Sequence, residues 1–214
     1  MSSYVTPAAR TFLGLLHALT GVMGAAKGYL RAHGPQVALL SRQIARGAGM
    51  SETDLAKVTL AGVLADVGMI GLAERAWEEA VPVLDRDTRE RVRRHPIRSA
   101  QTLGGIPYLE GLVDVVRHHH EWYDGSGYPD GLGGDEIPLG ARVLRLADTV
   151  VALSNARPHR DPYDPDRLRA TLQEYRGAEF DPRIVEVYFD LSAGGGIAPF
   201  DGHAYKRFVR SASE

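Results

Sequence analysis

The sequence HHHEWYDGSGYPDGLGGDEIP, residues 118–138, decides how the rest of the chain is interpreted. Three histidines and a glutamate run directly into a glycine-rich segment that must be a loop. Apolar residues at helical spacing flank this segment: Leu109, Leu112, Val113 and Val116 precede it, and Val143, Ala147, Val150 and Val151 follow it. Because the histidines stand at the end of a strongly apolar helix, we interpret them as part of a buried site rather than as a solvated patch.

Helical spacing of apolar residues recurs through most of the remaining chain. Val37, Leu40 and Ile44 indicate a helix that stops near residue 47. Further helix starts are predicted where a capping residue precedes a proline or an acidic residue: Ser51 with Asp54, Asp164-Pro165 and Asp181-Pro182. Strand signals are scarce. The sequence therefore predicts an all-α, single-domain helical bundle.

The bundle is expected to span residues 31–190, between an N-terminal amphipathic helix (1–30) and a C-terminal tail (191–214). Residues 12–26 faintly resemble a signal peptide, but Thr6-Pro7 and the helical spacing favour an amphipathic helix. Its apolar stripe carries Gly14, Gly21 and Gly24, which makes it a candidate contact for a homodimer.

Composition narrows the classes of partner and of metal site. Hydrophobic residues make up 44% and charged residues 24% of the 214 positions, and the formal net charge is −2. This balance gives no reason to expect a nucleic-acid polymer or a membrane as the partner. Because the chain has no cysteine, any metal must be held by His, Asp or Glu. A reducing, cytoplasmic location fits the same absence.

The motifs together resemble the HD-GYP family of phosphohydrolases. The resemblance is carried by His119-His120-Glu121, Asp124-Gly125-Ser126-Gly127-Tyr128-Pro129, Ile137-Pro138-Leu139, Ala141-Arg142, Ala147-Asp148 and Arg157-Pro158, in this order and spacing. It extends more faintly from Tyr29 to Phe189. The resemblance implies a helical domain that binds two or three iron or manganese ions and hydrolyses the bacterial messenger cyclic di-GMP. Some members of the family signal through protein contacts instead.

The resemblance also implies the site residues. The expected metal ligands are His33, Asp66, His95, His119, His120 and Asp148. Asp66 is expected to bridge two ions and to be the catalytic residue. The expected substrate-binding residues are Arg157, Gly127 and Tyr128. The Gly127-Tyr128-Pro129 loop is also a candidate contact for signalling proteins.

Two departures from the family pattern weaken one half of this site. Ala65 stands where the family has the histidine of its His-Asp pair, and Met69 stands where it has a lysine. One ion keeps four expected ligands, whereas the second would have only His33, Asp66 and Asp148. We therefore expect one bound ion and weak binding of a second. Loss of either the second ion or the lysine costs on the order of 10²-fold in rate, by analogy with removing one preorganised charge.

Three hypotheses stay open from the sequence alone. The first is a metal-dependent phosphodiesterase that acts on cyclic di-GMP or a related nucleotide. The second is a non-catalytic regulator that acts by binding a nucleotide or a protein. The third is a hydrolase that uses one ion on a different phosphoester. Ala65 and Met69 favour the second hypothesis, and the retained ligand set favours a bound metal.

Overall fold

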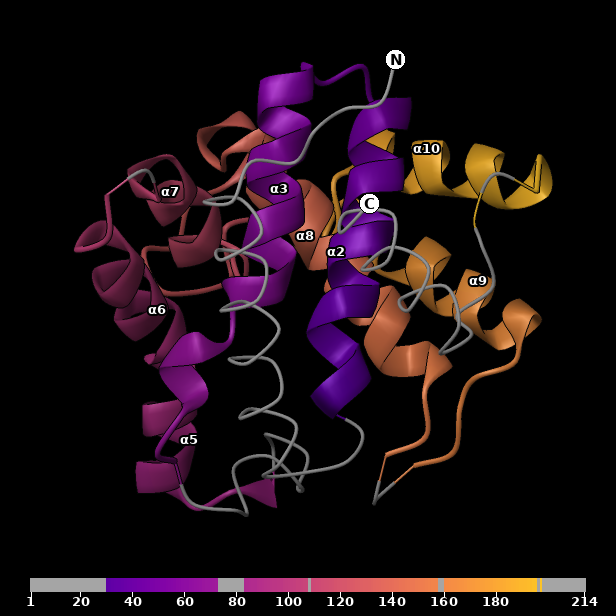
Figure 1. The fold of residues 1–214 in the computed structure, drawn as a ribbon. Helices are drawn as coiled ribbons and strands as arrows, with labels where there is room; N and C mark the ends of the chain where they lie inside the picture. Colours follow the sequence, from indigo (N-terminus) through magenta and orange to yellow (C-terminus); the bar gives the residue numbers. More distant parts are fainter. Residues whose placement is uncertain (1–29, 73–82, 108, 158–159, 196, 198–214) are drawn as a thin grey trace.

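The computed structural model describes residues 30–72, 83–107, 109–157, 160–195 and 197 (Figure 1). The predicted N-terminal helix and most of the predicted tail lie outside these residues, so the proposed domain boundaries stay predictions. The helices are α2 (Leu30–Gly47), α3 (Glu52–Leu64), α5 (Arg86–Arg93), α6 (His95–Gly104), α7 (Val113–Arg117), α8 (Leu139–Ser154), α9 (Pro165–Glu174) and α10 (Pro182–Ala193). Single 3-10 turns are η1 (Val67–Met69), η3 (Glu110–Leu112) and η4 (Gly134–Glu136).

Within the described ranges the protein is all-α, as predicted. Extended pairing there is limited to two isolated bridges, Arg157 with Arg160 and Arg176 with Phe180. The described residues also include no helix with the length and apolar character needed to cross a membrane.

The predicted helix starts are confirmed by their capping hydrogen bonds. Ser51 Oγ accepts from Asp54 N at 3.2 Å, and Asp164 Oδ1 accepts from Arg167 N at 2.8 Å. Asp181 likewise accepts from the backbone of the helix that it precedes. The predicted helix over residues 109–116 differs in its first turn, which is the 3-10 turn η3. Gly111 lies in that turn, and glycine is a poor α-helix former.

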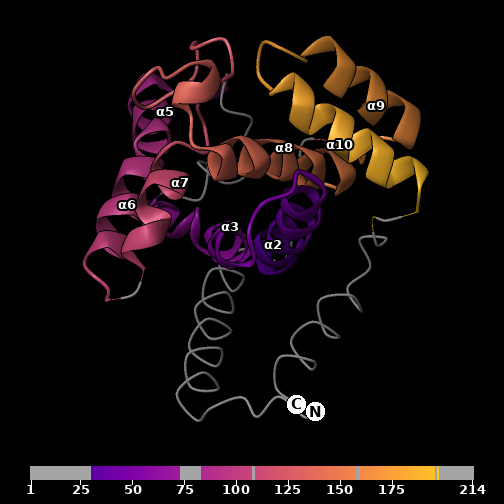
Figure 2. The same ribbon diagram turned by 90° about the horizontal axis from the view of Figure 1, so that it is seen from above.

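Helices α2, α3 and α8 form the centre of the core. Leu40, Val58 and Val150 represent the three helices there, and none is more than 1% exposed. Helices α2 and α3 pack closely, because Gly62 faces Ala38: a Cβ at Gly62 would lie only 2.7 Å from Ala38 Cα. Figure 2 shows α5, α6 and α7 on one side of α8, and α9 and α10 on the other. This arrangement places one face of α8 beside the histidine-rich segment.

Candidate metal centre

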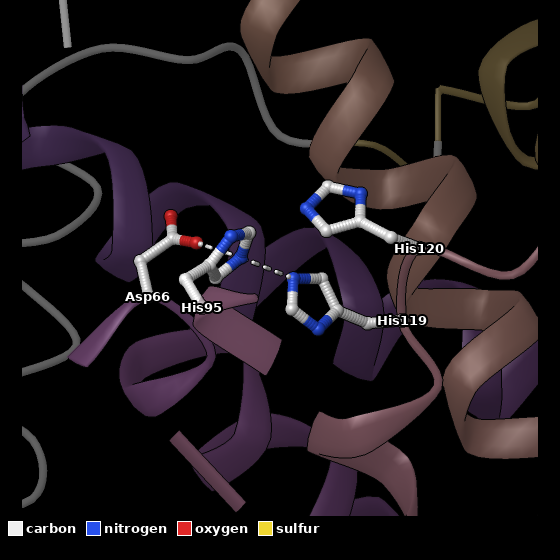
Figure 3. Close-up of side chains that lie close together, drawn as sticks. All are labelled: Asp66, His95, His119 and His120. Carbon is white, nitrogen blue, oxygen red and sulfur yellow. Dashed lines mark hydrogen bonds and ion pairs between the residues drawn. The ribbon is translucent and has the colours of Figure 1, made fainter. Parts of the chain in front are cut away.

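Four of the six predicted ligands converge on one point. Single ligand atoms of Asp66, His95, His119 and His120 all lie within 4.8 Å of one another (Figure 3). Asp66 follows α3, His95 begins α6, and the two later histidines follow α7. The cluster therefore joins three helix ends that are far apart in the sequence.

The turn after α3 is held against α6 by Ser99. Its hydroxyl donates to Ala65 O at 2.6 Å and accepts from Gly68 N at 2.8 Å. The backbones touch because residue 68 has no side chain: a Cβ there would overlap His95 O and lie 2.7 Å from Ser99 N. This packing brings Asp66 Oδ1 to 3.2 Å from His95 Nε2. Partial burial opposes ionisation of Asp66, yet the neighbouring histidines hold its pKa below the ordinary value.

His95 and His119 are held in the same tautomer by backbone carbonyls. The Nδ1 of His95 lies 2.7 Å from Val92 O, and the Nδ1 of His119 lies 2.6 Å from Val116 O. Because a carbonyl oxygen only accepts, each Nδ1 donates, and in a neutral ring the Nε2 then carries the lone pair. The two Nε2 atoms face each other at 3.3 Å. Burial, followed by the nearby His95, lowers the pKa of His119 to about 4, so its ring is neutral at physiological pH.

The other two predicted ligands form a separate ion pair. His33 Nε2 lies 2.8 Å from Asp148 Oδ1, and Arg145 Nη1 lies 3.8 Å from Asp148 Oδ2. Burial would raise the pKa of Asp148, but the bond from His33 and the charge of Arg145 hold it well below its usual range. This carboxylate is therefore ionised and already has a hydrogen-bond partner in His33 and a cationic neighbour in Arg145.

Arg145 was not among the residues chosen from the sequence. Its Nη1 lies 3.1 Å from His120 Nδ1, and its Nη2 donates to Glu179 Oε1. Its position three residues before Asp148 on α8 could have indicated it, because residues at that spacing share a helix face. Arg145 thus links His120, Asp148 and Glu179.

Tyr128 packs flat on His120 from the glycine-rich loop. The ring centroids are 5.0 Å apart with an interplanar angle of 23°, and Arg93 lies over the phenol ring at 4.5 Å. Burial raises the pKa of Tyr128, so its phenol stays protonated. Gly127 allows the loop to approach, because a Cβ there would lie 2.6 Å from Glu121 Cα. The predicted substrate contacts of Gly127 and Tyr128 stay predictions, since both residues have packing roles here.

The buried Glu121 side chain fixes the glycine-rich loop through hydrogen bonds to its backbone. It is only 2% exposed, and its Oε1 accepts from Asp130 N at 2.7 Å and from Gly131 N at 3.1 Å. The sequence motif includes Glu121, but its residue type alone did not reveal this role. His118 belongs to the loop support as well, because its Nε2 lies 3.0 Å from Asp130 Oδ2. Arg117 donates hydrogen bonds from Nε and Nη2 to the two oxygens of the same carboxylate.

The positions that depart from the family pattern are apolar and buried. Ala65 is 7% exposed and belongs to the main core, and Met69 is 6% exposed and packs with Leu84 and Val92.

Arg157 lies beyond α8, where its backbone exchanges two hydrogen bonds with Arg160 (2.8 and 3.0 Å). The predicted substrate contact of Arg157 stays a prediction.

The donor set fits a divalent metal ion. Neutral imidazoles and a carboxylate suit first-row transition metals. When both rings are neutral, the facing Nε2 atoms of His95 and His119 each carry a lone pair, with Asp66 Oδ1 beside His95 Nε2. A cation between them would satisfy both nitrogens and the Asp66 carboxylate.

Comparison with known proteins agrees with this geometry. A family model described as an HD domain matches residues 22–184. The chain is 36% identical over 146 residues to the cyclic di-GMP phosphodiesterase response regulator RpfG of Xanthomonas campestris, which covers 67% of this chain and 38% of that protein. It is 30% identical over 161 residues to a cyclic di-GMP phosphodiesterase of Thermotoga maritima, covering 74% and 44%. A 3'3'-cGAMP-specific phosphodiesterase 2 of Vibrio cholerae is 29% identical, covering 74% and 31%. The chain thus spans less than half the length of these relatives.

Two solved structures share the fold. A cyclic GMP-AMP-specific phosphodiesterase of Vibrio cholerae superposes with a TM-score of 0.71 at 17% identity, over 91% of this chain and 52% of that one. Bd1817, an HDG"Y"P protein of Bdellovibrio bacteriovorus, gives a TM-score of 0.62 at 18% identity, over 87% and 61%. At these identities the likeness concerns the fold alone.

Proposed function

Because this chain belongs to the HD domain family, we propose that it binds one divalent metal ion through Asp66, His95, His119 and His120 and acts there on a cyclic dinucleotide. Iron and manganese are the proposed metals, since carboxylate and imidazole ligands suit them. Cyclic di-GMP is the proposed nucleotide, because relatives from Xanthomonas campestris and Thermotoga maritima are named as its phosphodiesterases. The cyclic GMP-AMP named for the Vibrio cholerae relative is the related alternative.

The observation that carries the proposal is the pair of facing imidazole nitrogens. Backbone carbonyls hold a proton on Nδ1 of His95 and of His119, so that the neutral rings leave two Nε2 lone pairs 3.3 Å apart beside the Asp66 carboxylate. This arrangement is unfavourable without a cation and suited to one. A bound divalent ion supplies Lewis acidity to a phosphoryl oxygen and makes water more acidic.

The surrounding side chains support an anionic ligand. Arg145 lies beside the cluster, and Arg93 lies over Tyr128, which stacks on His120. Guanidinium groups are well suited to phosphate oxygens. We assign nucleotide contacts to Tyr128 and Gly127 of the loop and to Arg157, with Asp66 as the catalytic carboxylate.

A second candidate function is that of a non-catalytic regulator. Two observations favour it: the buried, apolar Ala65 and Met69 replace a ligand and a cation, and Asp148 is already paired with His33. A domain with one ion would then bind the nucleotide without efficient cleavage and signal through the Gly127-Tyr128-Pro129 loop.

The test separates metal binding, nucleotide binding and turnover. The protein is purified without oxygen, loaded with Fe²⁺ or Mn²⁺, and assayed for metal content, nucleotide binding by calorimetry, and hydrolysis of cyclic di-GMP and 3'3'-cGAMP. Turnover that a chelator abolishes supports the phosphodiesterase. Bound metal and nucleotide without turnover support the regulator. Failure to bind either metal contradicts both.

A further inference from the structure

Helices α5 and α6 carry a surface pocket that is rich in arginine. It has a volume of about 420 Å³ and is lined by Arg91, Arg94, Ile97, Arg98 and Gln101. We call it the arginine pocket. Both helices lie at one side of the molecule in Figures 1 and 2. Three of the five lining side chains carry a guanidinium group, whose planar fork of donors suits phosphate and carboxylate oxygens.

The arginine pocket and the histidine cluster lie on opposite faces of α6. The buried residues of α6 are His95, Pro96, Ser99, Ala100 and Leu103. Successive residues turn by about 100° around an α-helix, so the centre of this buried set lies about 180° from the pocket residues of the same helix. Arg93 is not part of the pocket, because its guanidinium lies over the Tyr128 ring beside the cluster. An anion in the pocket is therefore separate from a ligand at the proposed metal centre.

The guanidinium groups of the pocket are only partly used by the protein. Arg98 Nη2 donates to Arg91 O at 3.0 Å, whereas Arg98 Nε is buried and has no hydrogen-bond partner among the described residues. Arg91 Nε lies 3.0 Å from Asp87 Oδ2, but both side chains are well exposed, so this pair is weak. Arg94 is exposed, and its side chain makes no polar contact with another described residue. Donors thus remain for a ligand.

The sequence around the pocket carries an excess of positive charge. Residues 85–98 include six arginines against three acidic residues, in a chain whose formal net charge is −2. A carboxylate or a phosphodiester group brings one negative charge. A phosphate monoester brings about 1.5 to 2 negative charges at pH 7 and three strong acceptor oxygens. Among these anions, the phosphate monoester best matches three guanidinium groups that share one pocket.

We propose that the arginine pocket binds a small molecule that carries a phosphate monoester, with Arg91, Arg94 and Arg98 holding the phosphate group. Ile97 then offers an apolar contact to the rest of the ligand, and Gln101 offers an amide with both donors and an acceptor. The pocket volume falls within the roughly 300–1,000 Å³ of small-molecule sites, which favours a free compound over a phosphorylated protein segment. Binding there requires neither the metal ion nor the cyclic dinucleotide.

Calorimetric titration of the full chain tests the site with GMP and inorganic phosphate, and with guanosine, which lacks the phosphate. We expect GMP and phosphate to bind and guanosine not to bind. Arg94→Gln should lower GMP affinity about 10- to 100-fold, because it removes charge-assisted hydrogen bonds. The matched control is Arg86→Gln on α5, which removes the same charge from an exposed residue outside the pocket. Equal losses in the two variants, or no binding of GMP and phosphate, would overturn the proposal.

Further measurements locate the ligand and identify its source. Arg91→Gln, which breaks only an exposed ion pair, should lose GMP affinity in the same range as Arg94→Gln. GMP affinity should be equal with and without a chelator, and a loss with the chelator would place GMP at the metal centre and overturn the proposal. A phosphoserine peptide that binds more tightly than GMP would overturn the assignment to a free small molecule.

Discussion

The surroundings of the histidine cluster divide into two parts, which we call the open half and the paired half. They differ in the partners that their polar side chains contact. In the open half, Asp66, His95 and His119 bring a carboxylate and two Nε2 atoms close together. In the paired half, Arg145 contacts both His120 and Asp148, and His33 contacts Asp148. The same residue types thus form the proposed cation site where backbone carbonyls contact the imidazoles, and an ion-pair network where an arginine enters. Ligand-type residues alone do not define a metal site, because the partners of each ligand decide which atom is free.

The largest expected effect is on the open half. Substituting His119 with alanine should lower Mn²⁺ affinity by about 100-fold or more, because a directly bound ligand matters more than the outer partners that cost about 10–100-fold. The matched control is His118→Ala, one residue earlier, whose ring contacts Asp130 and the carbonyl of Asp114. Calorimetric titration with Mn²⁺ measures both. Equal losses in the two variants would show that the open half is not the binding site.

A second experiment asks whether Arg145 opposes the binding of a second ion in the paired half. The Arg145 guanidinium lies 3.8 Å from Asp148 Oδ2, where its charge opposes a cation at that carboxylate. We therefore expect Ala65→His to retain about one metal equivalent, and Ala65→His with Arg145→Ser to approach the roughly two ions of a binuclear site. Elemental analysis of the purified proteins gives the ratio. A second equivalent in the single variant would mean that Ala65 alone accounts for the loss.

A third experiment tests whether the loop supports only the paired half. In Gly127→Ala the new Cβ would crowd the backbone of Glu121, so we expect a loss of about 1–3 kcal/mol in unfolding free energy, typical of overpacking. Displacement of Tyr128 should reach His120, so we expect a smaller loss of Mn²⁺ affinity than in His119→Ala. Gly105→Ala is the control, because the nearest atom to its Cβ would be 3.8 Å away. Urea denaturation and Mn²⁺ titration together give the answer, and a loss of Mn²⁺ affinity as large as in His119→Ala would contradict a division of the site into two halves.

The smallest expected effect concerns the loop's outer support. Arg117, followed by His118, lowers the pKa of Asp130 below its ordinary 3.8. A depressed carboxyl pKa stabilises the fold above the unfolded value and loses that effect as pH falls through the folded value. Because the pair is about one-third exposed, Asp130→Asn should cost at most about 1 kcal/mol at neutral pH. The difference from the unchanged protein should shrink as the pH is lowered through 3.8 and below. A difference that is independent of pH would assign the effect to packing.

The sequence predicted the helices well, because they depend on local signals. Capping residues and prolines mark where α3, α9 and α10 begin. The family resemblance indicated Asp66, His95, His119 and His120, which the fold brings together, and their role as metal ligands stays a prediction. The paired half could not be predicted in the same way. Arg145, on α8, and Glu179, before α10, meet only through tertiary packing, and no spacing rule connects an arginine to a histidine 25 residues away.

The contacts of Tyr128 with Arg93 and His120 couple the position of the glycine-rich loop to the histidine cluster. Tyr128 belongs to the glycine-rich loop, and its ring contacts both the end of α5 and a histidine of the cluster. A protein that bound the loop and displaced Tyr128 would therefore change the free energy of a nucleotide bound beside His120. By thermodynamic linkage, the nucleotide would change the affinity of that protein by the same factor. One aromatic ring would then be enough to couple the proposed nucleotide site to a partner of the loop, with or without turnover.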